Sequence, residues 1–412
     1  MFLHGIVSTI SFFIFLPFFY VERCIHNKSF GWKEKFGNVE CELDNTRKTV
    51  MLHACSVGEV NAIEHLAKRI KKQHPEYNLV ITTGTKTGQD LAQKKFKEVA
   101  ELVTYFPFDV PYMVDKFLDK VNPNLVFIAE TEIWPNFAYR CKKRNIPVCI
   151  VNGRISDSTY RQYRIAKPFF SQVFKNFHSV LVQSDEDREK YIKIGMNPES
   201  VELMGNLKFD ITAPEGAIDL GHEGFKVIVA GSTHDIENKI AIDTFERLRK
   251  DNSNVKLLIA PRHLEDKSYI VSVLEKAEIQ YGFRSKEDNF KSADVIILDT
   301  LGELGKVYSI CDIAYIGGSF SKTGGHNPLE ATIFYKPTVS GPSVYNFKDI
   351  YRILTKADAS KVVSNQEDFY MELRKLVTDE SYYTQMSQAC KSVFDSQKGA
   401  IDFVIRKLEE II

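Results

Sequence analysis

The chain has 412 residues, of which 44% are hydrophobic and 26% are charged. This length and composition suffice for two domains with separate cores, and they exclude a disordered or fibrous protein. The 54 basic and 54 acidic side chains cancel, so the overall charge does not predict binding to nucleic acid. Seven scattered cysteines without a Cys-x-x-Cys pair favour reduced thiols in a cytosolic setting over a disulfide framework or a zinc site.

Residues 1–22 predict a membrane anchor. Residues 6–20 are almost wholly apolar, and Arg23, Lys33 and Lys35 follow them. The run is slightly short for a span, which needs about 20 residues, so a tilted span and a monotopic anchor both remain open. A cleaved signal peptide is disfavoured, because no basic segment precedes the run and no small-x-small cleavage site follows it. Basic residues after the anchor predict that the bulk of the chain lies on the cytoplasmic side of the membrane.

Two series of alternating strand-like and helix-like segments follow the anchor, and they predict two α/β domains with parallel sheets covered on both faces. We place the first domain at 23–212, a turn-rich linker at 213–222 and the second domain at 223–412. The expected strands lie at residues 50–53, 79–83, 125–128, 148–151 and 179–183, and then at 225–230, 255–260, 295–298, 313–316 and 337–340. The tail, residues 379–412, predicts two helices, and whether they pack back on the first domain stays open.

Polar residues follow the strands of the first domain. Ser56, Gly58 and Glu59 come after the first strand, the segment Gly-Thr-Lys-Thr-Gly at 84–88 comes after the second, and Glu130 comes after the third. Because ligands bind at the carboxyl ends of parallel strands, these residues predict a polar rim. Gly58 and Gly88 open expected helices whose first N–H groups can hold an anion, although ordinary turn glycines explain them equally well.

A glycine-rich segment at 317–330, Gly-Gly-Ser-Phe-Ser-Lys-Thr-Gly-Gly-His-Asn-Pro-Leu-Glu, lies between an expected strand and an expected helix at 329–334. Two glycine pairs let the backbone pass close to a ligand, and a helix starting near Pro328 would direct N–H groups toward an anion such as a phosphate. The spacing matches neither a Walker loop nor the Gly-x-Gly-x-x-Gly fingerprint, which argues against an ATPase or a dehydrogenase.

The strand ends of the second domain are expected to meet in one crevice, because its sheet is parallel. Ser232 and Thr233 supply hydroxyl groups there, and Arg262 supplies a guanidinium for phosphate oxygens. Asn327 and Glu330 suit the hydroxyl groups of a sugar. Two such domains facing a central cleft are the plan of GT-B glycosyltransferases, which place the sugar nucleotide mostly in the second domain and the acceptor in the first.

Over nearly its whole length the chain resembles the 3-deoxy-D-manno-octulosonic acid (Kdo) transferases of lipid A biosynthesis. The segments that carry the resemblance are 32–37, 53–62, 130–136, 152–156, 205–210, 230–234, 261–263, 302–304 and 324–330. The resemblance implies a GT-B fold of two doubly wound, Rossmann-like parallel-sheet domains facing a central cleft, with an N-terminal membrane anchor helix. It also implies an inverting, metal-independent transfer of Kdo from CMP-β-Kdo to the glucosamine disaccharide of a lipid A precursor (lipid IVA). This is an early step of lipopolysaccharide core assembly at the cytoplasmic side of the bacterial inner membrane.

By the resemblance, Glu34 is the general base that takes the proton of the acceptor hydroxyl. The residues alone would instead favour a solvated Glu in a Lys-Glu-Lys run. By the same resemblance, Glu130 corresponds to a second functional carboxylate, although the nearby Glu132 is an alternative for this role. A structural role for Glu130, in which it bonds backbone N–H groups of a neighbouring loop, also remains open. The residues expected to bind the acceptor are Lys33, Lys35, Ser56 and Lys86, and the lysines would contact its phosphates.

The residues expected to bind the donor are Ser232, Thr233, Arg262, Gly302, Leu304, Gly324, Gly325, Asn327 and Glu330. Arg154 and Lys208 are further candidates for holding acid groups of donor or acceptor. We expect neither a metal nor a cofactor, since we assign no carboxylate-rich segment to a metal site of the Asp-x-Asp kind. The alternatives are another GT-B enzyme that uses a UDP-sugar, an epimerase of UDP-sugars, or a catalytically silent, membrane-tethered homologue. The number of Kdo units, the acylation of the acceptor and the oligomeric state stay open.

Overall fold

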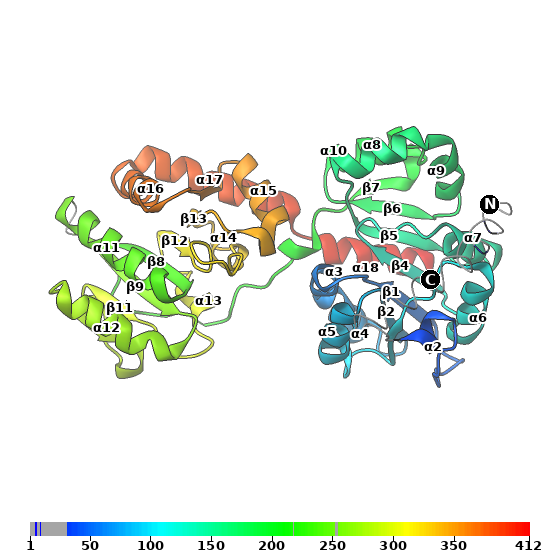
Figure 1. Cartoon of the computed structure of the whole chain (residues 1–412), viewed down its shortest axis with the longest axis horizontal. Coiled ribbons are helices and arrows are strands. Elements are labelled where there is room, and N and C mark those ends of the chain that lie inside the picture. The colour runs from blue at the N-terminus through cyan, green and yellow to red at the C-terminus, as the bar shows by residue number, and fades with distance from the viewer. Residues whose placement is uncertain (1–4, 6–8, 10–30, 217, 252–253) are drawn as a thin grey trace, which may run out of the picture. The chain divides into compact units, whose positions relative to one another are not determined.

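The computed structural model describes Gly5, Thr9 and residues 31–216, 218–251 and 254–412. The chain forms two compact units (Figure 1). Unit 1 comprises Met1–Asp210 together with Gln397–Ile412, and unit 2 comprises Ile211–Ser396. Each unit is built on a seven-stranded sheet.

The sheet of unit 1 is parallel throughout and has the strand order β3-β2-β1-β4-β5-β6-β7. Its strands are β1 (Thr49–His53), β2 (Asn78–Thr83), β3 (Leu102–Tyr105), β4 (Leu125–Ala129), β5 (Val148–Gly153), β6 (Ser179–Val182) and β7 (Val201–Leu203). The chain adds strands on one side of β1 and then on the other, so the topological switch point lies between β1 and β4. Doubly wound sheets bind ligands at this point.

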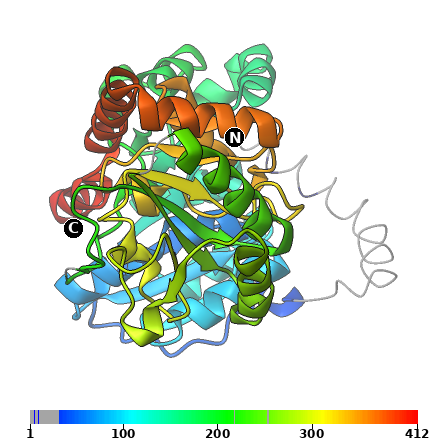
Figure 2. The same cartoon turned by 90° about the vertical axis from the view of Figure 1, so that its left-hand side faces the viewer.

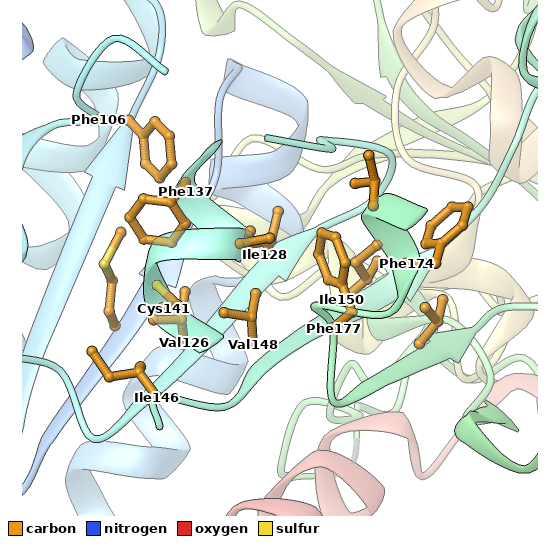
Figure 3. Packing of buried hydrophobic residues seen from close by; sticks show 14 of the residues in the cluster. Phe106, Val126, Ile128, Phe137, Cys141, Ile146, Val148, Ile150, Phe174 and Phe177 are labelled. Atoms are coloured by element: carbon orange, nitrogen blue, oxygen red, sulfur yellow. The ribbon is translucent and has the colours of Figure 1, made fainter. Parts of the chain in front are cut away.

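Helices cover both faces of this sheet. One face carries α6 (Pro111–Val121), α7 (Pro135–Lys143), α9 (Lys167–Phe174) and α10 (Asp185–Lys193), and the other carries α3 (Val57–Ala62), α4 (Glu64–Gln73), α5 (Lys86–Phe96) and α18 (Ala400–Ile411). Figure 3 shows part of the first layer, where Val126, Val148 and Ile150 of the sheet pack with Phe137 and Cys141 of α7. Smaller elements of unit 1 are α2 (Trp32–Lys35), α8 (Asp157–Ile165), η1 (Pro198–Ser200) and η2 (Leu207–Phe209).

The sheet of unit 2 is also parallel and has the order β10-β11-β9-β8-β12-β13-β14, so its switch point lies between β8 and β12. Its strands are β8 (Lys226–Thr233), β9 (Val255–Pro261), β10 (Tyr281–Phe283), β11 (Val295–Ile297), β12 (Ile313–Ile316), β13 (Thr338–Ser340) and β14 (Ser360–Val362).

The helices of unit 2 surround its strands (Figure 2). They are α11 (Asp235–Asp251), α12 (Lys267–Lys276), α13 (Leu304–Val307), α14 (Leu329–Thr332), α15 (Lys348–Lys356), α16 (Gln366–Thr378) and α17 (Glu380–Gln397), with η3 (Leu264–Asp266), η4 (Arg284–Lys286) and η5 (Tyr345–Phe347) between them. One buried layer joins the sheet to α11, α12 and α16, and a second layer on the other face includes residues of α13 and α14. The predicted α/β class with two parallel sheets is confirmed.

The boundary between the units differs from the one we predicted at 213–222. Ile218 and Leu220 are buried in unit 2, and Leu220 accepts the N–H of Phe290 (2.8 Å), so this stretch is packed and does not act as a free linker. Whether the tail helices pack back on the first domain was left open. The last of them, α18, does so, because its apolar face is buried in unit 1 and the carboxylate of Asp210 accepts the N–H of Ile401.

The predicted membrane anchor at residues 1–22 lies outside the described residues, apart from Gly5 and Thr9. Within the described part of the chain, no helix combines the length and the apolar character that crossing a membrane requires.

Candidate active site

Two loops meet at the switch point of unit 2. One follows β8, whose last two residues are Ser232 and Thr233, and the other follows β12 and begins with Gly317. The N–H of Gly317 donates to the carbonyl of Gly231 (2.8 Å). A Cβ atom on Gly317 would lie 2.4 Å from the carbonyl oxygen of Ser232, so only glycine allows the two backbones to come this close. Ser232 itself has a left-handed backbone, with φ of 54°.

The predicted glycine loop turns back on itself before α14 begins. The N–H of Gly325 donates to the carbonyl of Gly318 (2.7 Å), and both residues, like Gly324, have positive φ, which glycine adopts without strain. Asn327 accepts the N–H of Leu329 (3.1 Å) through its side-chain oxygen. The helix after the loop is confirmed, although α14 has only four residues.

Arg262 extends from the end of β9 toward this loop. Its backbone N–H donates to the carbonyl of Thr233 (2.8 Å), and its side chain is exposed. Glu330 is exposed overall, but its carboxyl group is partly shielded from solvent. This desolvation raises the pKa of the carboxyl group, and the positive charge of Arg262 opposes the rise. The structure therefore brings a guanidinium and a carboxyl group together from two separate motifs.

Two histidines link the same loops. Nε2 of His234 lies 3.1 Å from Nε2 of His326, and the rings are stacked. Burial, then the neighbouring His234 and Arg262, lower the pKa of His326 to about 4, so this ring is neutral at neutral pH. Sequence reasoning did not assign a role to either histidine.

The segment after β11 reaches the end of β8 as well. Leu304 lies next to Gly231, since a Cβ atom on that glycine would be 3.2 Å from Cδ1 of Leu304. Gly302 has φ of 81° and open space around it. Glu303 between them is held by Thr300 and by Arg284 (3.1 Å), and both contacts lower its pKa. The four predicted strand ends of unit 2 therefore do converge.

We predicted that the hydroxyl of Thr233 binds the donor substrate, but the structure gives this hydroxyl another partner. Its side chain is fully buried, and its hydroxyl donates to the side-chain oxygen of Asn238 (2.6 Å). Ser232 is half-buried and keeps its place at the strand end.

In unit 1, Glu130 lies at the switch point directly after β4. It is 5% exposed, and its backbone is left-handed, with φ of 58°. Its two carboxylate oxygens contact Nε of Arg154 (2.8 Å) and Nζ of Lys208 (3.3 Å). We predicted a catalytic carboxylate or a contact with backbone N–H groups, whereas its side-chain partners here are two cations from two other motifs.

A second carboxyl group, Glu59, lies close to Glu130. Burial, followed by the charges of Glu130 and Glu132, raises the pKa of Glu59 to about 7. Its oxygens accept the N–H of Cys55 (2.5 Å) and the hydroxyl of Ser56 (3.2 Å), so the hydroxyl of Ser56, which we expected to bind the acceptor, donates to a neighbour within the protein. Burial and then Glu130 also raise the pKa of Glu132. Three acidic groups and two cations thus share this switch point.

Cys55 is no nucleophile in this setting. Burial, together with the charges of Glu132 and Glu59, raises the pKa of its thiol to about 12. The thiol is therefore protonated at neutral pH, and nucleophilic attack requires a thiolate.

Glu34 lies in α2, which packs at the carboxyl ends of β2 and β3. The ammonium of Lys35 fixes this helix, because it donates to the carbonyl of Gly84 (3.0 Å) and lies 4.9 Å from the ring centroid of Tyr105. Burial and then the charges of Asp90 and Glu34 raise the pKa of Tyr105 to about 12. Glu34 and Glu130 thus lie at the same edge of one parallel sheet.

The lysines predicted to bind the acceptor have different environments. Lys35 is buried, so its expected contact with an acceptor phosphate is not supported; it anchors α2 instead. Lys33 is exposed and lies 3.9 Å from the carboxylate of Glu40. Lys86 is exposed at the first residue of α5. Across residues 31–216, 218–251 and 254–412, no group of three or more His, Cys, Asp or Glu side chains is arranged to hold a metal ion.

Comparison with known proteins connects this geometry to a family. The family model described as 3-Deoxy-D-manno-octulosonic-acid transferase (kdotransferase) matches residues 30–211. A 3-deoxy-D-manno-octulosonic acid transferase from Rickettsia felis is 30% identical over 82% of this chain and 73% of that protein. The enzyme of the same name from Haemophilus influenzae is 28% identical over 91% of this chain and 89% of that protein.

A solved structure with a similar fold covers most of this chain. UDP-GlcNAc 2-epimerase from Neisseria meningitidis, bound to UDP-GlcNAc, has a TM-score of 0.52 at 12% identity and covers 88% of this chain and all of that one (100%). This likeness supports the fold alone, a pair of Rossmann-like units of the GT-B type.

Proposed function

Because the chain belongs to the family of 3-deoxy-D-manno-octulosonic acid (Kdo) transferases, we propose that it moves Kdo from CMP-β-Kdo to lipid IVA with inversion at the anomeric carbon. Kdo transfer is the activity that the family and the two relatives described above have in common by name, and we propose that this chain performs it in lipopolysaccharide biosynthesis. One observation best supports CMP-Kdo as the donor. Arg262, Asn327 and Glu330, which come from two motifs, lie near one another at the switch point of unit 2.

In this proposal the loops of unit 2 bind CMP. The exposed guanidinium of Arg262 contacts the phosphate, since a guanidinium matches phosphate oxygens in charge and geometry. Asn327 and Glu330 bind ribose hydroxyls and the phosphate region, and Gly302, Leu304, Gly324 and Gly325 shape the walls along the nucleotide. As the bond from Kdo to the phosphate breaks, CMP gains negative charge, and Arg262 stabilises that charge.

Unit 1 supplies the chemistry on the acceptor. The carboxylate of Glu34 takes the proton of the attacking glucosamine hydroxyl while the new C–O bond forms and the bond to CMP breaks. Glu130 holds Arg154 and Lys208 through its two oxygens, so it orients two cations that suit the carboxylate of Kdo. The exposed Lys33 and Lys86 contact acceptor phosphates.

We also propose that the protein acts at the cytoplasmic face of the inner membrane, because its acceptor is a lipid. The apolar run at residues 6–20 supports this location. An exposed surface around Ile165 supports it as well, because Ile165 is 86% exposed and the exposed Arg161, Arg164 and Lys167 flank it. Such a surface suits anionic lipid headgroups. After cell fractionation the chain is expected in the membrane pellet, and recovery in the soluble fraction would contradict this location.

The nucleotide base separates this proposal from the alternative of a UDP-sugar enzyme. We expect calorimetry to show that CMP binds and that UDP binds at least about tenfold more weakly, a difference of roughly 1.4 kcal/mol. Equal or tighter binding of UDP would favour the alternative. We further propose that transfer needs neither a metal nor a cofactor.

A further inference from the structure

A buried carboxylate lies beneath the glycine loop. Glu237, the third residue of α11, is 0% exposed. One of its oxygens accepts the N–H of Ser319 (2.8 Å) and Phe320 (2.7 Å), and the other accepts the N–H of Gly318 (2.7 Å) and His234 (3.0 Å). No motif match had pointed to this residue.

These four contacts resemble an anion-binding site in which the bound anion is a side chain of the protein itself. Three successive N–H groups that converge on one anion form the kind of backbone nest in which many phosphates are bound. Here the nest holds the carboxylate of Glu237. The N–H groups of Gly318, Ser319 and Phe320 are therefore already engaged, which leaves the phosphate of a ligand to Arg262 and to the later part of the loop.

We propose that Glu237 is the positioning residue that sets the conformation of the glycine loop for donor binding. A buried carboxylate is tolerated only when hydrogen bonds satisfy its oxygens. The loop must therefore keep its N–H groups directed inward. This orientation accompanies the left-handed backbone of Gly318, whose φ is 70°.

The same side chain joins two loops of the site. Through His234 it binds the turn after β8, and through residues 318–320 it binds the loop after β12, which leads to Asn327 and Glu330. The pair of His234 and His326 links these loops a second time. The inference deepens the proposed function, since it concerns the same donor site.

The test compares Glu237→Gln with Glu246→Gln. Glutamine keeps the size of the side chain but turns one acceptor into an NH₂ group that faces N–H donors. Glu246 lies on the same helix and pairs with Lys250 at 2.9 Å, so its variant controls for a lost charge on α11. CMP titrations by calorimetry report the dissociation constant and the binding-competent fraction separately.

For Glu237→Gln we expect the dissociation constant for CMP to rise at least about tenfold, with a binding-competent fraction like that of wild type and Glu246→Gln. A merely structural role would lower that fraction and leave the dissociation constant unchanged, and this result would overturn the proposal. If Glu237→Gln does not fold, Glu237→Asp, which keeps the charge but is one methylene shorter, is measured instead. It too must raise the dissociation constant for the proposal to stand.

Hydrogen exchange of the unliganded protein separates this inference from the proposed function. In Glu237→Gln, amides 318–320 are expected to exchange faster than in wild type, while Glu246→Gln leaves them unchanged. This measurement needs no nucleotide, so it tests the positioning role of Glu237 even if wild type fails to bind CMP. That failure would count only against the proposed donor. Unchanged exchange at these amides would overturn the positioning role.

Discussion

Replacing Glu34 with Gln is expected to lower the rate of Kdo transfer by about 10²- to 10⁴-fold, the usual contribution of a general base. The amide keeps the shape of the side chain but cannot take the proton from the acceptor hydroxyl. CMP should bind as tightly as to wild type, because Glu34 belongs to unit 1 and the proposed nucleotide site belongs to unit 2. Single-turnover rates and CMP titrations measure the two effects separately.

Glu40→Gln is the matched control for Glu34. Glu40 follows α2 closely, its side chain is 92% exposed, and it pairs with Lys33 at 3.9 Å. We expect this variant to retain wild-type turnover. Near-normal turnover in Glu34→Gln would remove Glu34 as the base and direct attention to Glu59, whose pKa of about 7 also suits proton transfer at neutral pH.

Replacing Arg262 with Ala is expected to weaken CMP binding by about 10- to 100-fold, since a hydrogen bond to a charged group contributes about 1.5–3 kcal/mol. The loss should become smaller as salt is added, because the side chain is exposed and its charge is screened. Calorimetry at two salt concentrations measures both effects.

Arg247→Ala serves as the control for Arg262. This arginine lies on α11 and pairs with Glu367 through two contacts of 2.7 and 2.9 Å. Its removal should leave CMP affinity unchanged. Unaltered affinity in Arg262→Ala would instead contradict the assignment of the phosphate contact.

The sequence predicted the inner strands of both sheets but missed β3, β7, β10 and β14, which are the four edge strands. Inner strands of a parallel sheet are buried on both faces and appear as continuous apolar runs, as in Ile313–Ile316. The edge strands are short, and those of three residues, such as Ser360–Val362, include a polar residue or a glycine. Each of them pairs with the strand next to it in the chain, so these strands were missed because they lack a continuous apolar run.

The same reason explains which site residues were predicted. Arg262 and Glu130 follow apolar strands directly, so the topology of a parallel sheet places them at its carboxyl edge. Glu237 and Lys35 have neighbours in sequence that are typical of a solvated surface, and only the fold shows that both are buried. One local signal was available for Glu59 and Glu237. Glu59 lies three residues after Ser56, and Glu237 lies three residues after His234, each at the start of a helix. This is the spacing of a capping box, and each carboxylate accepts a backbone N–H near that start.

Transfer of Kdo to a lipid A precursor is the reaction that we propose for this chain. The most direct test incubates the full chain with CMP-Kdo, generated in place because it is labile, and a dispersed tetra-acylated lipid A precursor, with and without EDTA, and records the mass of the lipid product. We predict a gain of one or more Kdo units, equal in both conditions, and the mass counts those units. No gain with active donor and dispersed acceptor would contradict the claim, and a gain that disappears with EDTA and returns with added metal would contradict its metal independence.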